Sequence, residues 1–331
     1  LAKRTYQRFW TLPVSTLDIA SNNALGLQGD NFVFDLAISN NGRYVVYGSQ
    51  CENQFSGDSN GRTDIHLKDV LTNELFWVST SSVGLASDQN SRAPVVSDDG
   101  RYVVFESHGS TLVAPDTNNA AEIFIKDTQA GALSVVSSSS AGVRGINSQQ
   151  YSARPAVTPE GRYVAFTSNF GGLVANDTNF KTDIFVKDVL TGSIVRVSTS
   201  SVGAEGDGFS DNADISDDGR YIVFQSTSTN LGGNTSGDAA IYRKDILTGA
   251  LVLVSSSASS ETANAFSTNP RISGDGRYVV FQSQATNLVN TSDTNGVEDI
   301  FWKDMDTGEV YLVSSSHSGE IGLAASQDAT V

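Results

Sequence analysis

The chain has 331 residues, of which 39% are hydrophobic, and its 21 Lys and Arg against 37 Asp and Glu give a net charge of −16. An acidic surface repels phosphate backbones and anionic lipids, which disfavours nucleic acid as a partner. No apolar run approaches the ~18 residues of a membrane span. The single cysteine, Cys51, rules out an intramolecular disulfide. The abundance of Val, Phe, Tyr, Ser, Thr, Asn and Gly is typical of a β-sheet protein with polar turns.

One motif, Gly-Arg-Tyr-Val-Val-Phe, recurs in close copies along the chain. The five copies begin at Gly42, Gly100, Gly161, Gly219 and Gly276. Self-similarity at a fixed period indicates a repeat architecture. We therefore predict a single repeat domain over residues 1–331, although this length would also suit two ordinary domains.

The second repeat shows the order of its predicted elements. A short strand ending at Val96 is followed by an Asp-Asp-Gly turn at 98–100, and such a turn between two apolar runs is a strong hairpin signal. The apolar run 101–105 predicts a second strand buried on both faces. A polar loop leads to a third strand at 122–125, which ends in Lys-Asp, and a fourth strand ends in Val-Ser at 136–137.

Four antiparallel strands per repeat, without any helical pattern, predict an all-β fold of the β-propeller kind with about five blades. A single blade cannot bury both of its faces, whereas stacked blades can. The predicted repeat units span about 32–80, 92–138, 152–199, 211–256 and 268–315.

The two ends leave the closure of the ring open. Residues 8–15 resemble a spare fourth strand, and the tail 316–331 resembles the approach to another first strand. We expect the spare strand to close a five-bladed ring as a clasp. The alternatives are six blades with one incomplete, or self-association through the terminal strands. Because the sequence begins at Leu1 rather than Met, we expect either a removed leader or a fragment.

Two stretches of the fourth repeat resemble a known repeat family. They are Ser-Asp-Asp-Gly-Arg-Tyr-Ile-Val-Phe at 216–224 and Ile-Tyr-Arg-Lys-Asp at 241–245. These residues are similar to WD40-like propeller repeats of the TolB type, called PD40, and the Asp-Thr-Asn-Gly loop at 293–296 resembles their longer bacterial variant. The resemblance covers about 10–316. It implies a propeller and an exported bacterial protein, periplasmic or at the cell surface, and it implies no single activity.

The loop before each third strand carries oxygen-bearing side chains at alternate positions and a later carboxylate. Such loops can wrap a hard cation, and Ca²⁺ takes six to eight oxygen ligands. The alternative is an Asx turn, in which Asp and Asn bond their own backbone. The fourth repeat lacks the pattern, with Asn234 and Ala240 in the carboxylate positions. The candidate ligands are Asp58, Asn60, Asp64, Asp116, Asn118, Glu122, Asp177, Asn179, Asp183, Asp293, Asn295 and Asp299.

An Arg in each second strand recurs together with the Asp of each Lys-Asp pair. We expect one charged pair per blade, with a structural role, because an active site is usually unique. The arginines are Arg43, Arg101, Arg162, Arg220 and Arg277.

A unique site is expected where the repeats differ. First strands line the central channel of a propeller, and there Asp35 and Asp214 replace neutral residues. They are weak candidates for a catalytic carboxylate pair, which a glycoside hydrolase needs. Arg154 and Arg271 occupy the equivalent positions in the first strands of other repeats, so salt bridges between blades are the alternative.

These observations predict an exported, non-enzymatic propeller that binds a protein or glycan at a loop face, or acts as a scaffold within a larger extracellular assembly. The alternative is a carbohydrate-active enzyme, a glycoside hydrolase or lyase, that uses the channel mouth. No pair among His66, His108 and His317 has the spacing of metal ligands. Apart from Ca²⁺ in the loops, no cofactor is indicated.

Overall fold

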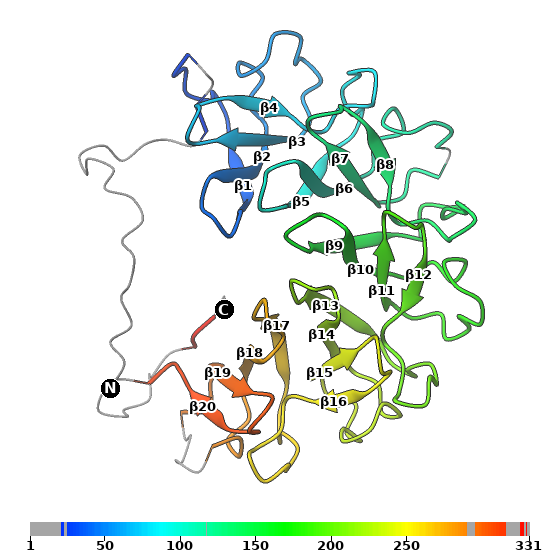
Figure 1. Cartoon of the computed structure of the whole chain (residues 1–331), viewed down its shortest axis with the longest axis vertical. Coiled ribbons are helices and arrows are strands. Elements are labelled where there is room, and N and C mark those ends of the chain that lie inside the picture. Colours follow the sequence, from blue (N-terminus) through cyan, green and yellow to red (C-terminus); the bar gives the residue numbers. More distant parts are fainter. Residues whose placement is uncertain are drawn as a thin grey trace.

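Five four-stranded antiparallel sheets make up the described part of the protein, with strands paired in chain order within each sheet (Figure 1). The structure, a computed structural model, describes residues 21–22, 25–116, 118–289, 295–315, 325–327 and 329. The sheets follow one another around an arc as the blades of a propeller. The predicted all-β propeller with five four-stranded blades is confirmed.

Each blade has three strands of six residues and a fourth of three. The first strands, on the inside of the arc, are β1 (Val33–Ile38), β5 (Ser91–Val96), β9 (Ser152–Val157), β13 (Ser210–Ile215) and β17 (Ser267–Ile272). The second strands are β2 (Tyr44–Ser49), β6 (Tyr102–Ser107), β10 (Tyr163–Ser168), β14 (Tyr221–Ser226) and β18 (Tyr278–Ser283). The third strands are β3 (Asp64–Asp69), β7 (Glu122–Asp127), β11 (Asp183–Asp188), β15 (Ala240–Asp245) and β19 (Asp299–Asp304). The outer strands are β4 (Leu75–Trp77), β8 (Leu133–Val135), β12 (Ile194–Arg196), β16 (Leu251–Leu253) and β20 (Val310–Leu312).

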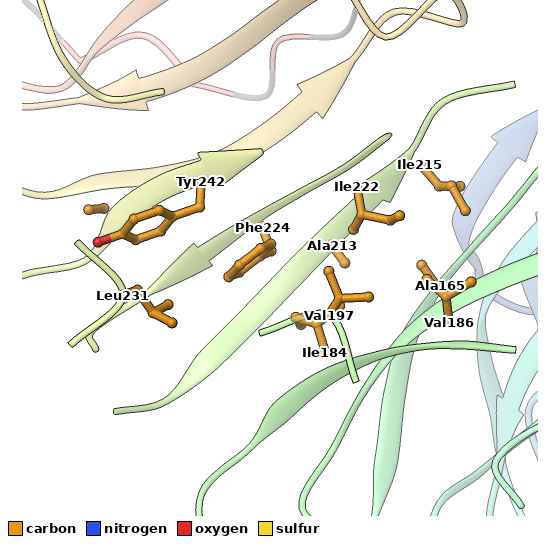
Figure 2. Packing of buried hydrophobic residues seen from close by; sticks show 11 residues of the cluster. Ala165, Ile184, Val186, Val197, Ala213, Ile215, Ile222, Phe224, Leu231 and Tyr242 are labelled. Atoms are coloured by element: carbon orange, nitrogen blue, oxygen red, sulfur yellow. The ribbon is translucent and has the colours of Figure 1, made fainter. Parts of the chain in front are cut away.

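The hydrophobic core lies between blades rather than within them. Four clusters of buried side chains fill the four contacts between successive blades. Figure 2 shows the one between the third and fourth blades, where Ile184 and Val197 meet Phe224 and Tyr242. Because the second strands of the three middle blades face a neighbour on both sides, their residues alternate between two cores, as Val103 and Val104 do, which explains the continuous apolar run.

The predicted charged pair is present in all five blades. Arg43 and Asp69 lie 2.6 Å apart, and the other four pairs lie 2.6 to 2.9 Å apart. Each arginine also lies over the ring of the tyrosine that follows it, as Arg43 does over Tyr44 at 4.9 Å. The pair joins the start of the second strand to the end of the third within one blade, so its role is structural.

The lysine of each Lys-Asp pair connects neighbouring blades. Lys126 donates from Nζ to the backbone carbonyls of Thr80 and Ser81, in the turn that follows the previous blade's fourth strand. Lys187, Lys244 and Lys303 make the same type of bond to the blade before theirs. These lysines are buried, and each satisfies carbonyls that water does not reach.

The first and fifth blades stand at the two ends of the arc (Figure 1). Among the described strands, those of these two blades do not pack together as successive blades do. Ile38 is consequently 61% exposed, whereas Ile272, its counterpart in β17, is 6% exposed. Val313 is 54% exposed, whereas Val197 is 1% exposed. The predicted clasp at 8–15 lies outside the described residues.

Residues 21–29, where described, repeat the turn that follows a fourth strand. The bridge between Asn22 and Gln28 matches the bridge between Thr80 and Ala86. Lys68 bonds to the carbonyl of Asn22 just as Lys126 bonds to that of Thr80. The first blade is therefore preceded by the end of another repeat unit.

Candidate functional site

Every first strand contains a β-bulge with one residue in the left-handed region of backbone conformation. At this position the pairing with the second strand shifts register, and the backbone adopts φ between 48° and 55°. Left-handed backbone is uncommon outside glycine, and its recurrence marks a conserved geometry of the inner wall. The five residues are Asp35, Ala93, Arg154, Asn212 and Asn269.

These inner residues and their neighbours line a central channel, a cavity of about 680 Å³ to which all five blades contribute. Polar bonds run from blade to blade around it. Arg154 pairs with Asp211 at 2.7 Å, and the Asn212 amide donates to Asn269 at 3.0 Å. Asn269 in turn donates to Gln282 at 2.6 Å. The wall of the channel thus presents amides and one guanidinium that are already hydrogen-bonded to each other.

Asp35 and Asp214, the two weak catalytic candidates, both border this channel. Asp35 accepts a bond from the backbone amide of Ala93 in the next blade, at 3.3 Å. Asp214 accepts from the amide of Ile272 in the next blade, at 2.9 Å. Burial raises the pKa of Asp214, and nearby Arg271 opposes that rise. Both carboxylates therefore connect adjacent blades, and neither forms an ion pair with Arg154 or Arg271 among the described contacts.

Aromatic side chains precede the first strands of four blades, at the end of the channel wall where these strands begin, and they were not singled out from the sequence. The residue just before the first strand is aromatic in four blades and is 38% to 74% exposed. We call this set the aromatic rim: Phe32, Tyr151, Phe209 and Phe266. Asn90 takes the position in the second blade. The signal was present in the sequence as an aromatic residue directly preceding four of the five first strands.

A groove separates two members of the aromatic rim. Tyr151 and Phe209 border a cavity of about 270 Å³ whose polar wall includes Asp211 and Gln225. The ammonium of Lys181 lies 4.5 Å from the centre of the Phe209 ring, a cation–π contact. Exposed aromatic faces next to a few oriented polar groups are the usual composition of a binding surface.

The opposite mouth of the channel is acidic. A polar cavity of about 320 Å³ is bordered by Asp98, Asp214 and Asp217, among others. Burial raises the pKa of Asp217, and the negative charges of Asp98 and Glu160 raise it further. The two ends of the channel are thus chemically distinct, one aromatic and one acidic.

The Asp-Asn loops form the Asx turns that were the alternative to a metal site. The Asn60 side chain accepts a bond from the backbone amide of Arg62 at 2.7 Å and donates to Asp64 at 3.1 Å. Asn118 and Asn179 accept the same backbone bond two residues on, each at 2.7 Å. The amide therefore organises each of these turns, and in the first and third blades it also bonds the later carboxylate.

Arginines contact the carboxylates of two of these loops. In the third blade Arg196 lies 3.5 Å from Asp177, 3.8 Å from Asp183 and in contact with Glu205. These three carboxylates can offer oxygens within 4.8 Å of one another, a spacing that could hold a metal ion. Burial and Asp183 raise the pKa of Asp177 to about 6, and Arg196 opposes the rise.

In the second blade the arginine that contacts the loop carboxylates comes from a different position in the chain. Arg144 lies 3.4 Å from Asp116 and contacts Glu122. In the fifth blade, Asn295 donates to Asp299 at 2.7 Å, and Asp293 lies outside the described residues. The fourth blade has Asn234 and Ala240 in place of the two carboxylates, and its Asn234 donates to the backbone of Asp238.

His66, one of the three scattered histidines, is buried in β3, where its ring meets those of Tyr47 and Phe55. Its Nδ1 lies 2.9 Å from the side-chain oxygen of Gln54. Burial lowers the pKa of His66 to about 4. This residue is part of the packing of the first blade, and His317 and Trp10 lie outside the described residues.

Comparison with solved structures finds other β-propellers. A putative TolB from Agrobacterium tumefaciens has a TM-score of 0.51 at 17% identity over 86% of this chain and 81% of that one. The β-propeller domain of the Trilobed protease from Pyrococcus furiosus, described as having an open velcro topology, has a TM-score of 0.52 at 13% identity, covering 91% and 76%. An oligogalacturonate lyase in complex with manganese has 0.51 at 16%, covering 86% and 65%.

Neither protein-family models nor curated proteins gave a match to the sequence. At identities of 13% to 17% the likeness to solved structures establishes the fold alone. The predicted TolB-like propeller is confirmed at that level. Within the described ranges, no helix has the length and apolar character that crossing a membrane requires.

Proposed function

We propose that this chain is an exported binding module, which holds a segment of another protein at the aromatic rim. The observation that carries the proposal is the set of exposed rings at equivalent positions of four blades, each directly before the innermost strand of its blade. Aromatic side chains supply large contact area at low entropic cost, and they dominate protein recognition surfaces.

The electrostatics and the fold support a protein ligand. The net charge of −16 disfavours nucleic acid. The groove between Tyr151 and Phe209 places Asp211 and Gln225 beside the rings, where they can bond the backbone of an extended segment. Propellers of the TolB kind, similar in fold, favour a scaffold within an extracytoplasmic assembly over an isolated enzyme. We propose the periplasm or the cell surface as its location, and Ca²⁺ as its only bound cofactor.

A peptide-display selection on the full chain tests this function. Peptides enriched on the wild type are expected to bind about tenfold or more weakly to a Tyr151→Ser, Phe209→Ser double variant. The control is Leu190→Ser with Leu247→Ser, which removes two apolar side chains that are even more exposed, 76% and 77%, from turns that join third and fourth strands. Equal binding to all three proteins, or no enrichment on the wild type, contradicts the proposal.

A carbohydrate-active enzyme is the second candidate, favoured by the channel cavity with its two carboxylates and by the fold shared with an oligogalacturonate lyase. Incubation with oligogalacturonate and other oligosaccharides, with and without Mn²⁺, tests it. Turnover by the wild type that disappears in Asp35→Asn or Asp214→Asn would establish the enzyme. Absence of turnover across the panel is the outcome expected of a binding module.

A further inference from the structure

The Asp-Asn loops of the second and third blades share one arrangement, in which a guanidinium lies against both acidic positions. In the third blade Arg196 reaches Asp177 and Asp183, and in the second Arg144 reaches Asp116 and Glu122. The two arginines come from different places. Arg196 is in β12, and Arg144 is in the turn after β8. Different residues thus supply a cation to the same point of the loop.

The guanidinium in each loop also donates a hydrogen bond to a backbone carbonyl at the same position of the loop. Arg196 donates to the carbonyl of Asn176 at 3.1 Å, and Arg144 donates to that of Pro115 at 3.1 Å. Both carbonyls belong to the residue before the first Asp of the loop. Each guanidinium therefore lies among a carbonyl and at least two carboxylates, with Glu205 as a third carboxylate in the third blade, and all of these are oxygen ligands.

The fourth blade shows that arginine and carboxylates are absent together. Its loop carries Asn234 and Ala240 at the two acidic positions. Leu253 stands where the third blade has Arg196, and Thr262 where the second blade has Arg144. Without buried negative charge, the loop needs no counter-ion.

The first blade keeps both carboxylates and lacks both arginines. Asp58 and Asp64 are buried, 9% and 1% exposed, while Trp77 and Ala86 occupy the two arginine positions. The framework is otherwise that of the third blade. Asn60 donates to Asp64 and to the carbonyl of Ser87, as Asn179 does to Asp183 and to that of Gly206.

The buried Asp58 carboxylate is also incompletely satisfied. Its Oδ1 has no hydrogen-bond partner, although the backbone of Asn60 bonds the carboxylate, and the charged neighbours that act on it most strongly are acidic: Asp64, Glu52 and Asp30. Burial, followed by the charge of Asp64, raises its pKa to about 6. Arg62, in the same loop, is exposed and forms no ion pair with either carboxylate among the described contacts. A buried carboxylate pair without a counter-ion is costly unless a cation binds.

We infer that the first blade binds one Ca²⁺ at the point where the sister blades hold a guanidinium, through Asp58 and Asp64. The residue before Asp58 is Gly57, whose carbonyl corresponds by position to those that Arg196 and Arg144 bond. Carboxylates and carbonyls are hard ligands, and a loop of oxygens around a buried pair suits the flexible coordination of Ca²⁺ better than the strict octahedron of Mg²⁺. The ion would join the β2–β3 loop, which carries Asp58, to the start of β3, which carries Asp64.

Trp77 lies close enough to the proposed site for metal binding to be followed by luminescence. Its indole donates to Ser79 at 3.2 Å, and Ser79 in turn donates to Asp64. Tb³⁺ is a luminescent substitute for Ca²⁺, and it emits when a nearby tryptophan is excited. We expect the full-length wild type to show tryptophan-sensitised Tb³⁺ emission that Ca²⁺ displaces, and a rise in Tm on adding Ca²⁺.

Four variants separate the possible outcomes. Asp58→Asn should weaken Ca²⁺ and Tb³⁺ binding by about tenfold or more, because ligand charge sets affinity. Without metal its Tm should equal or exceed that of the wild type, because an unpaired buried charge is gone. Trp77→Phe should lose the emission and keep the Ca²⁺-dependent rise in Tm. Trp77→Arg should lose both, since it supplies the arginine of the third blade. Asp177→Asn, in the arginine-filled loop, should keep both.

The proposal is overturned if the wild type shows neither emission nor a Ca²⁺-dependent Tm, or if Asp58→Asn leaves both unchanged. A lower metal-free Tm for Asp58→Asn would also count against it, since that would show the carboxylate to be paired within the protein. The isosteric Asp58→Asn keeps the test decisive even if Trp77→Arg does not fold. None of these readouts depends on the aromatic rim, so this inference and the proposed function fail separately.

Discussion

The ring of Tyr102 packs against Gly161 in the next blade so closely that a Cβ on Gly161 would lie 2.3 Å from the Cδ2 atom of the ring. The same contact joins Tyr44 to Gly100, Tyr163 to Gly219 and Tyr221 to Gly276. The recurring Gly-Arg-Tyr motif thus works across blades, with the tyrosine of one motif covering the glycine of the next. Gly42 begins the first motif, and a Cβ there would have no atom within 4 Å.

This difference predicts unequal effects of two identical substitutions. Both Gly42 and Gly161 have positive φ, 73° and 75°, so alanine costs about 1 kcal/mol of backbone strain at either position. Gly161→Ala also forces Tyr102 to move, which raises the expected loss to about 3 kcal/mol. Urea unfolding of the two variants measures the difference. Equal losses would mean that the tyrosine moves aside without cost.

The buried lysines should contribute more to stability than is usual for lysine, which mostly lies at protein surfaces. Lys126→Met leaves the carbonyls of Thr80 and Ser81 unsatisfied between two blades, and we expect a loss of about 2 kcal/mol in the free energy of unfolding. Lys181→Met is the control, because its ammonium contacts a ring at the surface, and a change within about 0.5 kcal/mol is expected there. A loss for Lys126→Met no larger than the control's would show that water reaches these carbonyls.

The repeat alone was sufficient to predict the blades, because hairpin turns and strand periodicity are local signals. The charged pair of each blade was predictable for a similar reason, since an Arg and an Asp recur in every unit at a spacing of 25 to 27 residues, as Arg43 and Asp69 do. The bonds of Asp35 and Asp214 to the next blade could not be derived, because they depend on how neighbouring first strands are placed side by side.

The arginine contacts show why the sequence could not reveal which of the Asp-Asn loops is free to bind a metal. Arg196 follows its loop within a strand, whereas Arg144 lies in a later turn, and no common spacing connects the two to their carboxylates. Only the folded blade shows that both reach the same point. The aromatic rim was visible as residues but not as a surface, because an aromatic residue before a strand is equally consistent with packing.

The open ends of the arc predict a contrast between two valines at equivalent positions. Val197 is 1% exposed between the third and fourth blades, and Val197→Ala should cost about 2 kcal/mol through lost burial and a residual cavity. Val313 is 54% exposed, so Val313→Ala should change stability by less than about 0.5 kcal/mol. Chemical denaturation of both variants checks this. A loss at Val313 as large as that at Val197 would show that something covers the fifth blade in solution.

The charged pairs give the protein a defined acid sensitivity. The guanidinium of Arg162 beside Asp188 holds the pKa of that carboxyl at about 2, below its ordinary value of 3.8. The unfolded chain therefore takes up a proton at a higher pH than the folded one, so the stabilisation is complete above about pH 4 and is lost as the pH falls toward about 2. Since Arg162 is 41% exposed, salt and solvent screen each pair, and the effect should shrink at high ionic strength.

The measurement is the free energy of unfolding of the wild type and Asp188→Asn at several pH values from about 5 to 2. Asp188→Asn should be less stable than the wild type at the upper end and should lose less on acidification, so that the two curves converge. Leu247→Ser, which changes an exposed side chain without a titratable group, is the control and should run parallel to the wild type. If the curve of Asp188→Asn ran parallel to that of the wild type, the ion pair would not lower the pKa of Asp188 in the folded state.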